Sequence, residues 1–258
     1  MELIKPIVKV GNSAGVILPK DWLNGEAKIT LIRKPRNIKQ DILDILEDDL
    51  SSIIGLYTVG SYARGEETAK SDIDVLGITQ NLDKKIKKGR YEINLVSQDT
   101  LNQTLKENIL PLLPMLKEAS SIINEKLLDS YKDYPITSSN LSLHIETTIS
   151  ALNVIKESIG LAKEENERIS DNIIYSLILR LREAYIVDCL LKGKIANNTD
   201  LIKLIKKLTG SKIAYDSYQR SKSNARNQRK VNFDEAEKIY NYVISLIEEQ
   251  KRWIKRRD

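Results

Sequence analysis

Residues 58–78 read TVGSYARGEETAKSDIDVLGI, and the order of apolar runs and turns in this stretch decides the fold. The apolar residues 53–59 predict a strand that the small residues Gly60 and Ser61 interrupt. A second strand is predicted at 73–78, and a short helix between the two. This order predicts a turn at which the backbone can approach a ligand closely, because glycine has no Cβ.

The turn and the second strand carry residues suited to a phosphate and a metal ion. Ser61 is predicted at a helix N-terminus, where free N–H groups and the helix dipole attract phosphate. Asp72 and Asp74 are two residues apart, so their carboxylates are expected on the same face of a strand. Because adjacent carboxylates repel each other, a divalent cation is their natural partner. The stretch therefore predicts a site for a nucleoside triphosphate with magnesium.

The order Gly-Ser, Arg-Gly and Ser-Asp-x-Asp resembles the signature of the polymerase-beta-like nucleotidyltransferases, including the minimal and kanamycin-type enzymes. It stands here as Gly60-Ser61-Tyr62-Ala63-Arg64-Gly65 followed by Ser71-Asp72-Ile73-Asp74. The resemblance implies transfer of a nucleoside monophosphate from a triphosphate to an acceptor, with Mg²⁺ or Mn²⁺ and release of pyrophosphate. It implies that Asp72 and Asp74 are catalytic metal ligands, and that Gly60, Ser61, Arg64 and Ser71 bind the nucleotide.

The same resemblance implies a third carboxylate on a neighbouring strand, as a metal ligand or as the base toward the attacking group. Glu92, on the strand predicted at 90–96, is the candidate. Relatives more often carry aspartate there, and Asn94 shares the face of Glu92. If Asn94 is the equivalent position, the base is missing.

Two of the nucleotide-binding assignments have alternatives. Arg64 either faces the triphosphate or caps the short helix, one helical turn after Ser61. Ser71 either binds the nucleotide or orders the turn before Asp72 through a bond between its side chain and the backbone.

Three segments that differ in the spacing of their apolar residues predict an α+β protein. Residues 1–34 predict a short N-terminal β-hairpin element, and residues 35–135 predict a nucleotidyltransferase core around a small mixed sheet. Within that core, a helical pattern interrupted by prolines runs from Asp99 to Leu128. Residues 136–258 predict an antiparallel four-helix bundle, because apolar residues recur there at helical spacing in four places.

Residues 9–20, KVGNSAGVILPK, resemble the swapped-hairpin domain of AbrB- and MazE-like transcription factors. Strands are predicted at 7–10, 15–19 and 27–32. Such domains pair two chains into one intertwined barrel and often bind DNA. So few residues cannot bury a core alone, so a homodimer is expected and DNA is a further candidate partner of residues 1–34. The alternative is a hairpin packed on the catalytic domain.

Composition and charge indicate the class of protein, its location and the kind of partner. A hydrophobic content of 41% with 30% charged residues describes a soluble globular protein, and no apolar run approaches the roughly 18 residues of a membrane span. The single cysteine, Cys189, fits a cytoplasmic protein. A formal charge of +5 favours an anionic partner. A basic stretch from Lys203 to Lys230, predicted as a loop, is either a solvated surface or a contact for phosphates or RNA.

Two functions remain open at this point. The first is the transferase, whose acceptor is a partner protein, an RNA end or a small hydroxylated molecule. The second is a DNA-binding transcriptional or antitoxin-type regulator, in which the N-terminal dimer reads DNA and the transferase core senses nucleotide.

Overall fold

The computed structural model describes residues 3–30, 37–69, 71–222 and 231–256. The chain divides into two compact units, residues 1–41 and 42–258, and each is described by itself. Among the described helices, none combines the length and the apolar character that a membrane crossing requires.

The first unit is built on a two-stranded antiparallel hairpin. Strands β1 (Ile7–Val10) and β2 (Ser13–Val16) pair across the turn at Gly11, and a 3₁₀ turn, η1, follows at Lys20–Trp22. The first predicted strand is confirmed, whereas the second lies at 13–16 rather than 15–19, because the two-residue turn fixes its register. The strand predicted at 27–32 is wrong for residues 27–30, which are irregular. Its last two residues lie outside the described chain.

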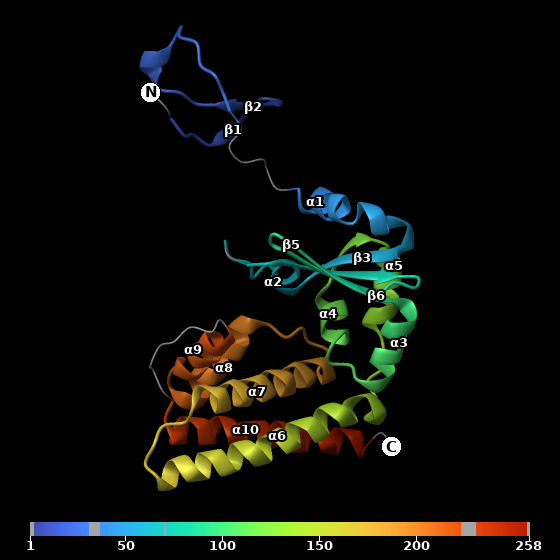
Figure 1. Ribbon diagram of the computed structural model, residues 1–258, viewed down its shortest axis with the longest axis vertical. Helices are drawn as coiled ribbons and strands as arrows, with labels where there is room; N and C mark the ends of the chain where they lie inside the picture. Colours follow the sequence, from blue (N-terminus) through green and yellow to red (C-terminus); the bar gives the residue numbers. More distant parts are fainter. Residues whose placement is uncertain (1–2, 31–36, 70, 223–230, 257–258) are drawn as a thin grey trace. The chain divides into compact units, whose positions relative to one another are not determined.

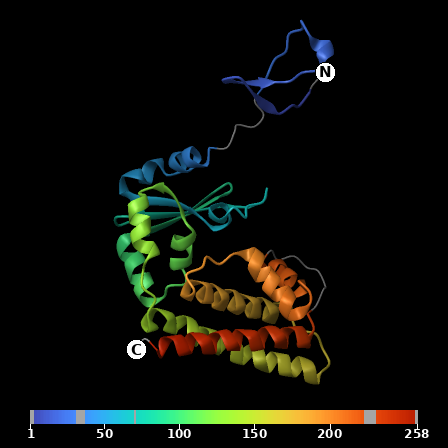
Figure 2. The same cartoon turned by 180° about the vertical axis from the view of Figure 1, so that it is seen from behind.

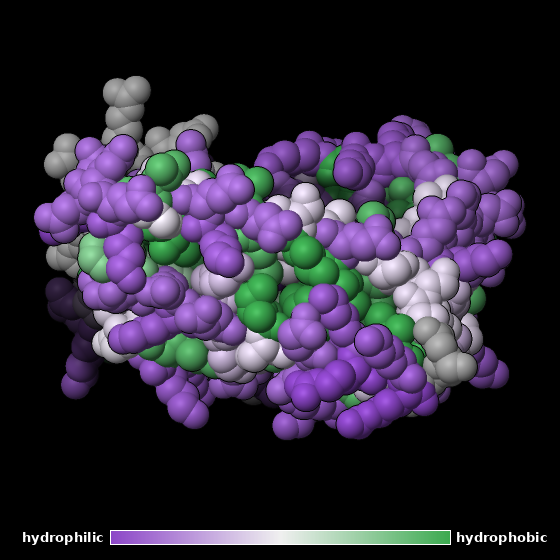
Figure 3. All heavy atoms as spheres, turned by 90° about the horizontal axis from the view of Figure 1, so that it is seen from below, coloured by the Kyte–Doolittle hydropathy of each residue, from purple (hydrophilic) through white to green (hydrophobic). Residues whose placement is uncertain are grey.

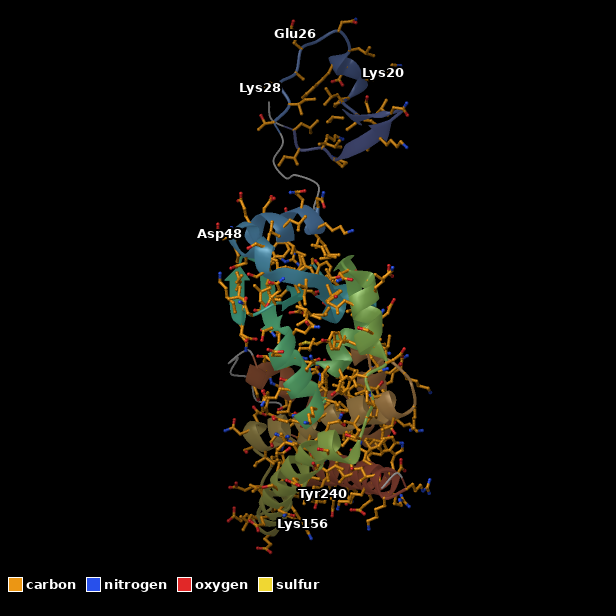
Figure 4. The ribbon with its side chains drawn as sticks, turned by 90° about the vertical axis from the view of Figure 1, so that its right-hand side faces the viewer. Lys20, Glu26, Lys28, Asp48, Lys156 and Tyr240 are labelled. Carbon is orange, nitrogen blue, oxygen red and sulfur yellow. The ribbon has the colours of Figure 1, made fainter. Side chains whose placement is uncertain are left out.

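This unit leaves its large apolar side chains exposed. Ile4 is 78% exposed, Ile17 69% and Leu23 68%. Its polar side chains Lys20 and Lys28 are exposed as well (Figure 4). No residue of the first unit from 3 to 30 is buried, so this part of the chain has no core of its own.

The second unit contains a five-stranded mixed sheet, with the helical region at the other end of the unit (Figure 1). The strand order is β5-β6-β4-β3-β7, and only the pair β4–β6 is parallel. The strands are β3 (Ile53–Val59), β4 (Ile73–Thr79), β5 (Lys84–Lys88), β6 (Tyr91–Ser97) and β7 (Ser120–Ile123). This arrangement confirms the predicted α+β class with a mixed sheet.

Short helices accompany the sheet. Helix α1 (Ile38–Ile45) and the 3₁₀ helix η2 (Glu47–Ser52) precede β3, and α2 (Gly60–Arg64) joins β3 to β4. After β6 come α3 (Gln98–Glu107), α4 (Leu113–Glu118) and α5 (Glu125–Lys132). Apolar side chains of α3, α4 and α5 pack on one face of the sheet, so that face is covered.

Two strands of this sheet were not predicted. Residues 120–123 were expected to continue a helix, but they form β7 and pair with β3, because the outer edge of β3 offers backbone partners that four residues between two helices can reach. Strand β5 escaped prediction because four of its five residues are lysines, which give no apolar alternation.

The helical region contains α6 (Ser138–Glu164), α7 (Asp171–Leu191), α8 (Asn198–Thr209), α9 (Ile213–Lys222) and α10 (Phe233–Ile254). Both ribbon views show α6, α7 and α10 packed side by side (Figures 1 and 2), and α9 packs against α7 while α8 packs against α10. Polar side chains cover most of the face seen from below, with apolar side chains between them (Figure 3). The described part of this region thus has five helices where four were predicted.

The fifth helix, α9, lies in the basic stretch that was predicted as a loop. Ala214, Ser217 and Tyr218 are buried, so one side of α9 packs against the other helices. The prediction of a loop is therefore wrong for the residues of α9. Residues 223–230 of the same stretch lie outside the described residues.

His144, on α6, is a buried polar residue that is only 2% exposed. Its Nε2 lies 3.1 Å from Oε1 of Gln250, and the amide nitrogen of Gln250 donates to the carbonyl of Ala184 at 2.9 Å. Because these polar atoms satisfy one another, the pair can be buried between α6, α7 and α10.

Candidate active site

The turn between β3 and α2 lies directly against a carboxylate. Gly60, the first residue of α2, has a φ of +68°, in the left-handed region that favours glycine. A Cβ on Gly60 would also overlap the carboxylate of Asp74 on β4. Glycine is therefore required twice at this position, by the backbone conformation and by the close approach of Asp74.

Strand register brings a second predicted residue beside Asp74. In the parallel pair β4–β6, Asp74 is opposite Glu92, whereas Asn94 is opposite Leu76. Residues in register on neighbouring strands share a face, so Glu92 is the neighbour of Asp74 and Asn94 is one pleat further along. Asp72 precedes β4 by one residue and is exposed. The structure therefore pairs Asp74 with Glu92 rather than with Asn94.

Glu92 contacts a cation on the next strand. Lys87 on β5 is in register with Glu92 and forms an ion pair with it. The hydrogen bond to Glu92 raises the pKa of Lys87, and the charge of Asp72 adds to this effect. Within the described ranges, no three carboxylate, histidine or cysteine side chains are gathered as a metal site. Asp72, Asp74 and Glu92 supply the oxygen ligands that Mg²⁺ prefers, but Glu92 is turned toward Lys87.

Arg64, at the end of α2, contacts two carboxylates. Its Nε donates to Glu66 at 2.8 Å, and its Nη1 donates to Glu118 at 2.6 Å. Burial alone would lower the pKa of Arg64, but the hydrogen bonds to Glu66 and Glu118 outweigh it and raise that pKa. No bond from this guanidinium to a carbonyl of α2 occurs among the described residues, and the C-cap of α2 is Gly65. Capping of the short helix is thus not what Arg64 does here.

The segment before Asp72 is fixed by Ser71 and Arg90. The hydroxyl of Ser71 accepts a hydrogen bond from the backbone nitrogen of Thr68 at 2.8 Å, which is the turn-ordering bond proposed for it from sequence. Arg90 donates from Nε to the carbonyl of Ser71 at 3.1 Å and from Nη2 to the hydroxyl of Tyr62 at 3.2 Å. Arg90 therefore links the start of β4 to α2, and no sequence motif predicted this role.

A cavity of about 490 Å³ opens beside the Gly60 turn. Four of the predicted residues line it, namely Gly60, Ser61, Arg64 and Asp74. Its volume lies within the range of small-molecule sites in proteins. The cavity is hereafter called the cleft. Asp72, Ser71 and Glu92 do not line it.

The opposite wall of the cleft comes from the helical region, including part of the basic stretch for which a contact with phosphates was one of two interpretations. It includes Arg182 and Tyr185 of α7, Asn198 of α8, and Tyr215 and Tyr218 of α9. The rings of Tyr218 and Tyr175 are stacked with centroids 5.2 Å apart, and Nη1 of Arg182 lies 3.4 Å from the hydroxyl of Tyr218. Tyr215 and Tyr218 lie within the basic stretch, and they were the feature of the sequence from which this wall could have been predicted.

Comparison with known proteins bears on the sheet region. Residues 39–128 match the family described as a nucleotidyltransferase domain. No curated protein matches the sequence significantly.

Two solved structures resemble the chain at low similarity. A nucleotidyltransferase-like protein from Exiguobacterium sibiricum 255-15 gives a TM-score of 0.39 at 14% identity, over 83% of this chain and 76% of that chain. A spectinomycin adenyltransferase from Enterococcus faecialis, solved with ATP and spectinomycin, gives 0.43 at 14% identity, over 83% of this chain and 100% of that chain. At this level neither structure indicates a substrate for this chain.

Proposed function

We propose that this chain, whose residues 39–128 match the nucleotidyltransferase domain family, transfers a nucleoside monophosphate from a triphosphate to an acceptor and releases pyrophosphate. The observation that carries the proposal is the placement of the Gly60 turn against Asp74, with Glu92 in register beside it, inside the matched family region. Backbone N–H groups beside paired carboxylates suit a triphosphate and the cation that accompanies it.

Each residue of the site has a proposed task. The Gly60-Ser61 turn and Arg64 bind the phosphates: the N–H of Ser61 and the guanidinium donate to phosphate oxygens, whereas the N–H of Gly60 donates to Glu118 at 2.7 Å. Asp72, Asp74 and Glu92 would hold Mg²⁺ or Mn²⁺, and the ion when bound neutralises phosphate charge and favours deprotonation of the acceptor. Glu92 is also suited to take the acceptor's proton.

Lys87 complements Glu92 in this scheme. The ion pair between them is on the surface, with Lys87 72% and Glu92 43% exposed, so it costs little to separate. Glu92 can therefore turn from Lys87 toward Asp74 when a divalent cation is present.

The cleft supports a place for the nucleoside or the acceptor. Tyr215, Tyr218 and Arg182 offer aromatic faces and a cation opposite the Gly60 turn. The acceptor is a partner protein, an RNA end or a small hydroxylated molecule, and the labelling experiment below distinguishes these three. The family match favours the enzyme over the DNA-binding regulator.

A homodimer through residues 1–34 belongs to the same proposal. The exposed apolar side chains of the first unit, such as Ile17 and Leu23, support it, because a second copy of the hairpin would cover them by symmetry. DNA binding by this segment is proposed only as a property of that dimer.

The test is nucleotide transfer by the double variant Asp72→Asn, Asp74→Asn. Purified protein is incubated with Mg²⁺, each labelled triphosphate and a cell extract, and labelled products are separated into protein, RNA and small molecules. The double variant is expected to lose transfer while keeping its melting temperature, since charge and not volume is removed. The matched control replaces two exposed aspartates, Asp48→Asn and Asp133→Asn. Undiminished transfer by the folded double variant would contradict the proposal.

A further inference from the structure

Glu118, the last residue of α4, joins two of the proposed phosphate-binding groups. Its Oε1 accepts from the backbone nitrogen of Gly60 at 2.7 Å, and its Oε2 accepts from Nη1 of Arg64 at 2.6 Å. The side chain is only 10% exposed. One buried carboxylate thus fixes both the backbone of the Gly60 turn and the guanidinium that follows it.

Glu66 holds the other side of the same guanidinium. Its Oε2 accepts from Nε of Arg64 at 2.8 Å, while its Oε1 accepts from the hydroxyl of Thr199 at 3.2 Å and from the backbone nitrogen of Thr199 at 3.4 Å. Burial alone would raise the pKa of Glu66, but the hydrogen bonds from Arg64 and Thr199 outweigh it and lower that pKa. Thr199 lies in the first turn of α8, so Glu66 connects α2 to the helical region.

The two carboxylates use Nε and Nη1 of Arg64 and leave Nη2 without a protein partner in the described part of the chain. Arg64 also lines the cleft. A planar guanidinium held at two nitrogens has a fixed plane, so its remaining donors keep one direction.

We propose that Glu118 and Glu66 are positioning residues of the transferase: they hold the Gly60 turn and Arg64 in the orientation that binds triphosphate, and they tie this turn to the start of α8 across the cleft. The inference rests on the proposed function. Glu118 and Glu66 both lie outside the Gly-Ser and Asp-x-Asp motif. Through them, the orientation of Arg64 depends on α4 and α8.

A different role for Glu118 predicts the opposite outcome. A carboxylate that merely occupies the donors of an empty phosphate site would have to leave when triphosphate binds, and removing its charge would strengthen binding. A positioning carboxylate stays, and removing either its charge or its reach weakens the site. Two substitutions separate charge from reach. Glu118→Asp keeps the charge but is one methylene too short to span Gly60 and Arg64 together, and Glu118→Gln keeps the length but loses the charge.

The experiment uses the full chain and three measurements: transfer kinetics, binding of a non-hydrolysable ATP analogue with Mg²⁺, and amide hydrogen exchange without nucleotide. Glu118→Asp, Glu118→Gln and Glu66→Gln are each expected to lower kcat/KM by about tenfold to a hundredfold, the cost of a small misplacement at a reacting centre. The control Glu67→Gln removes the same charge from an exposed neighbour and should match the wild type. Glu118→Gln that binds the analogue more tightly and keeps its turnover would overturn the proposal, as would Glu118→Asp with wild-type kinetics.

Amide exchange makes the outcome independent of activity. Glu118→Asp should accelerate exchange in the peptide that contains Gly60, and Glu66→Gln should accelerate it in the peptide that contains Thr199. If the wild-type protein transfers no nucleotide, the proposed function fails, and exchange alone decides the positioning role. Unchanged exchange in both peptides would then refute it.

Discussion

Replacing Gly60 by alanine tests the link between turn geometry and the Asp74 carboxylate. The substitution puts an L-residue at a φ of +68°, which costs about 1–2 kcal/mol in the folded state. The new Cβ would also overlap the Asp74 carboxylate, so either the turn or Asp74 must move. We expect a loss of about 1–2 kcal/mol from the backbone alone, and a fall in transfer of about a hundredfold from displacement at the reacting centre.

Two other glycines provide matched controls for Gly60→Ala. Gly65 has a φ of +65° and Gly89 a φ of +60°, and a Cβ at either position meets no atom within 4 Å. Gly65→Ala and Gly89→Ala should therefore carry the same backbone cost without disturbing Asp74. Chemical denaturation gives the free energy of unfolding of each variant, and labelled triphosphate gives its transfer rate. Equal transfer rates in the three variants, at equal stability loss, would refute the reasoning that the Gly60 turn sets the position of Asp74.

Three further predictions concern other parts of the chain. Glu92→Gln should lower transfer by roughly two to four orders of magnitude and Asn94→Ala only slightly, and the reverse order in a kinetic assay would show that Asn94 is the functional position. Removal of residues 1–34 should convert a dimer into a monomer while sparing transfer; light scattering decides, and a monomeric full-length protein would contradict it. Burial lowers the pKa of His144 to about 4, so the folded protein binds this proton less readily than the unfolded chain, and stability should be complete above about pH 6.5 and fall by roughly 3 kcal/mol as the pH drops toward 4. Denaturation of His144→Gln across that range should show a flatter dependence, and an unchanged slope would contradict the assignment.

The sequence predicted the Gly60 turn, Asp74 and the strands around them because all of these lie within one short stretch. Local spacing there determines both the element type and the face on which a side chain stands. Glu92 could also be predicted from the sequence, because apolar and polar residues alternate regularly along its strand. Sequence could not choose between Glu92 and Asn94, because both share a face and only the pairing with β4 separates them.

Contacts between distant segments were beyond sequence reasoning. Glu118 is the last residue of a short helix with no motif around it, and its role depends on its contact with Gly60, 58 residues away. The far wall of the cleft depends on how α7 and α9 pack, and α9 itself was predicted as a loop because its polar residues dilute the helical pattern of its buried face. Lysine-rich β5 was missed since its order comes from pairing with β6 and not from apolar alternation.

The packing of the sheet region carries a consequence for how this protein can be divided. Leu141 of α6, together with Val187 and Leu190 of α7, belongs to the same buried cluster as the sheet residues Tyr57 and Leu76. A cut between the two regions would leave that cluster open to water on one side, and Glu66 would lose its partner on α8 at the same point. Residues 39–128, which match the family, therefore cannot be transferred to another protein as an independent domain. Recombination that exchanged the helical region for another would have to replace three core side chains and the hydrogen bonds between Thr199 and Glu66 at once.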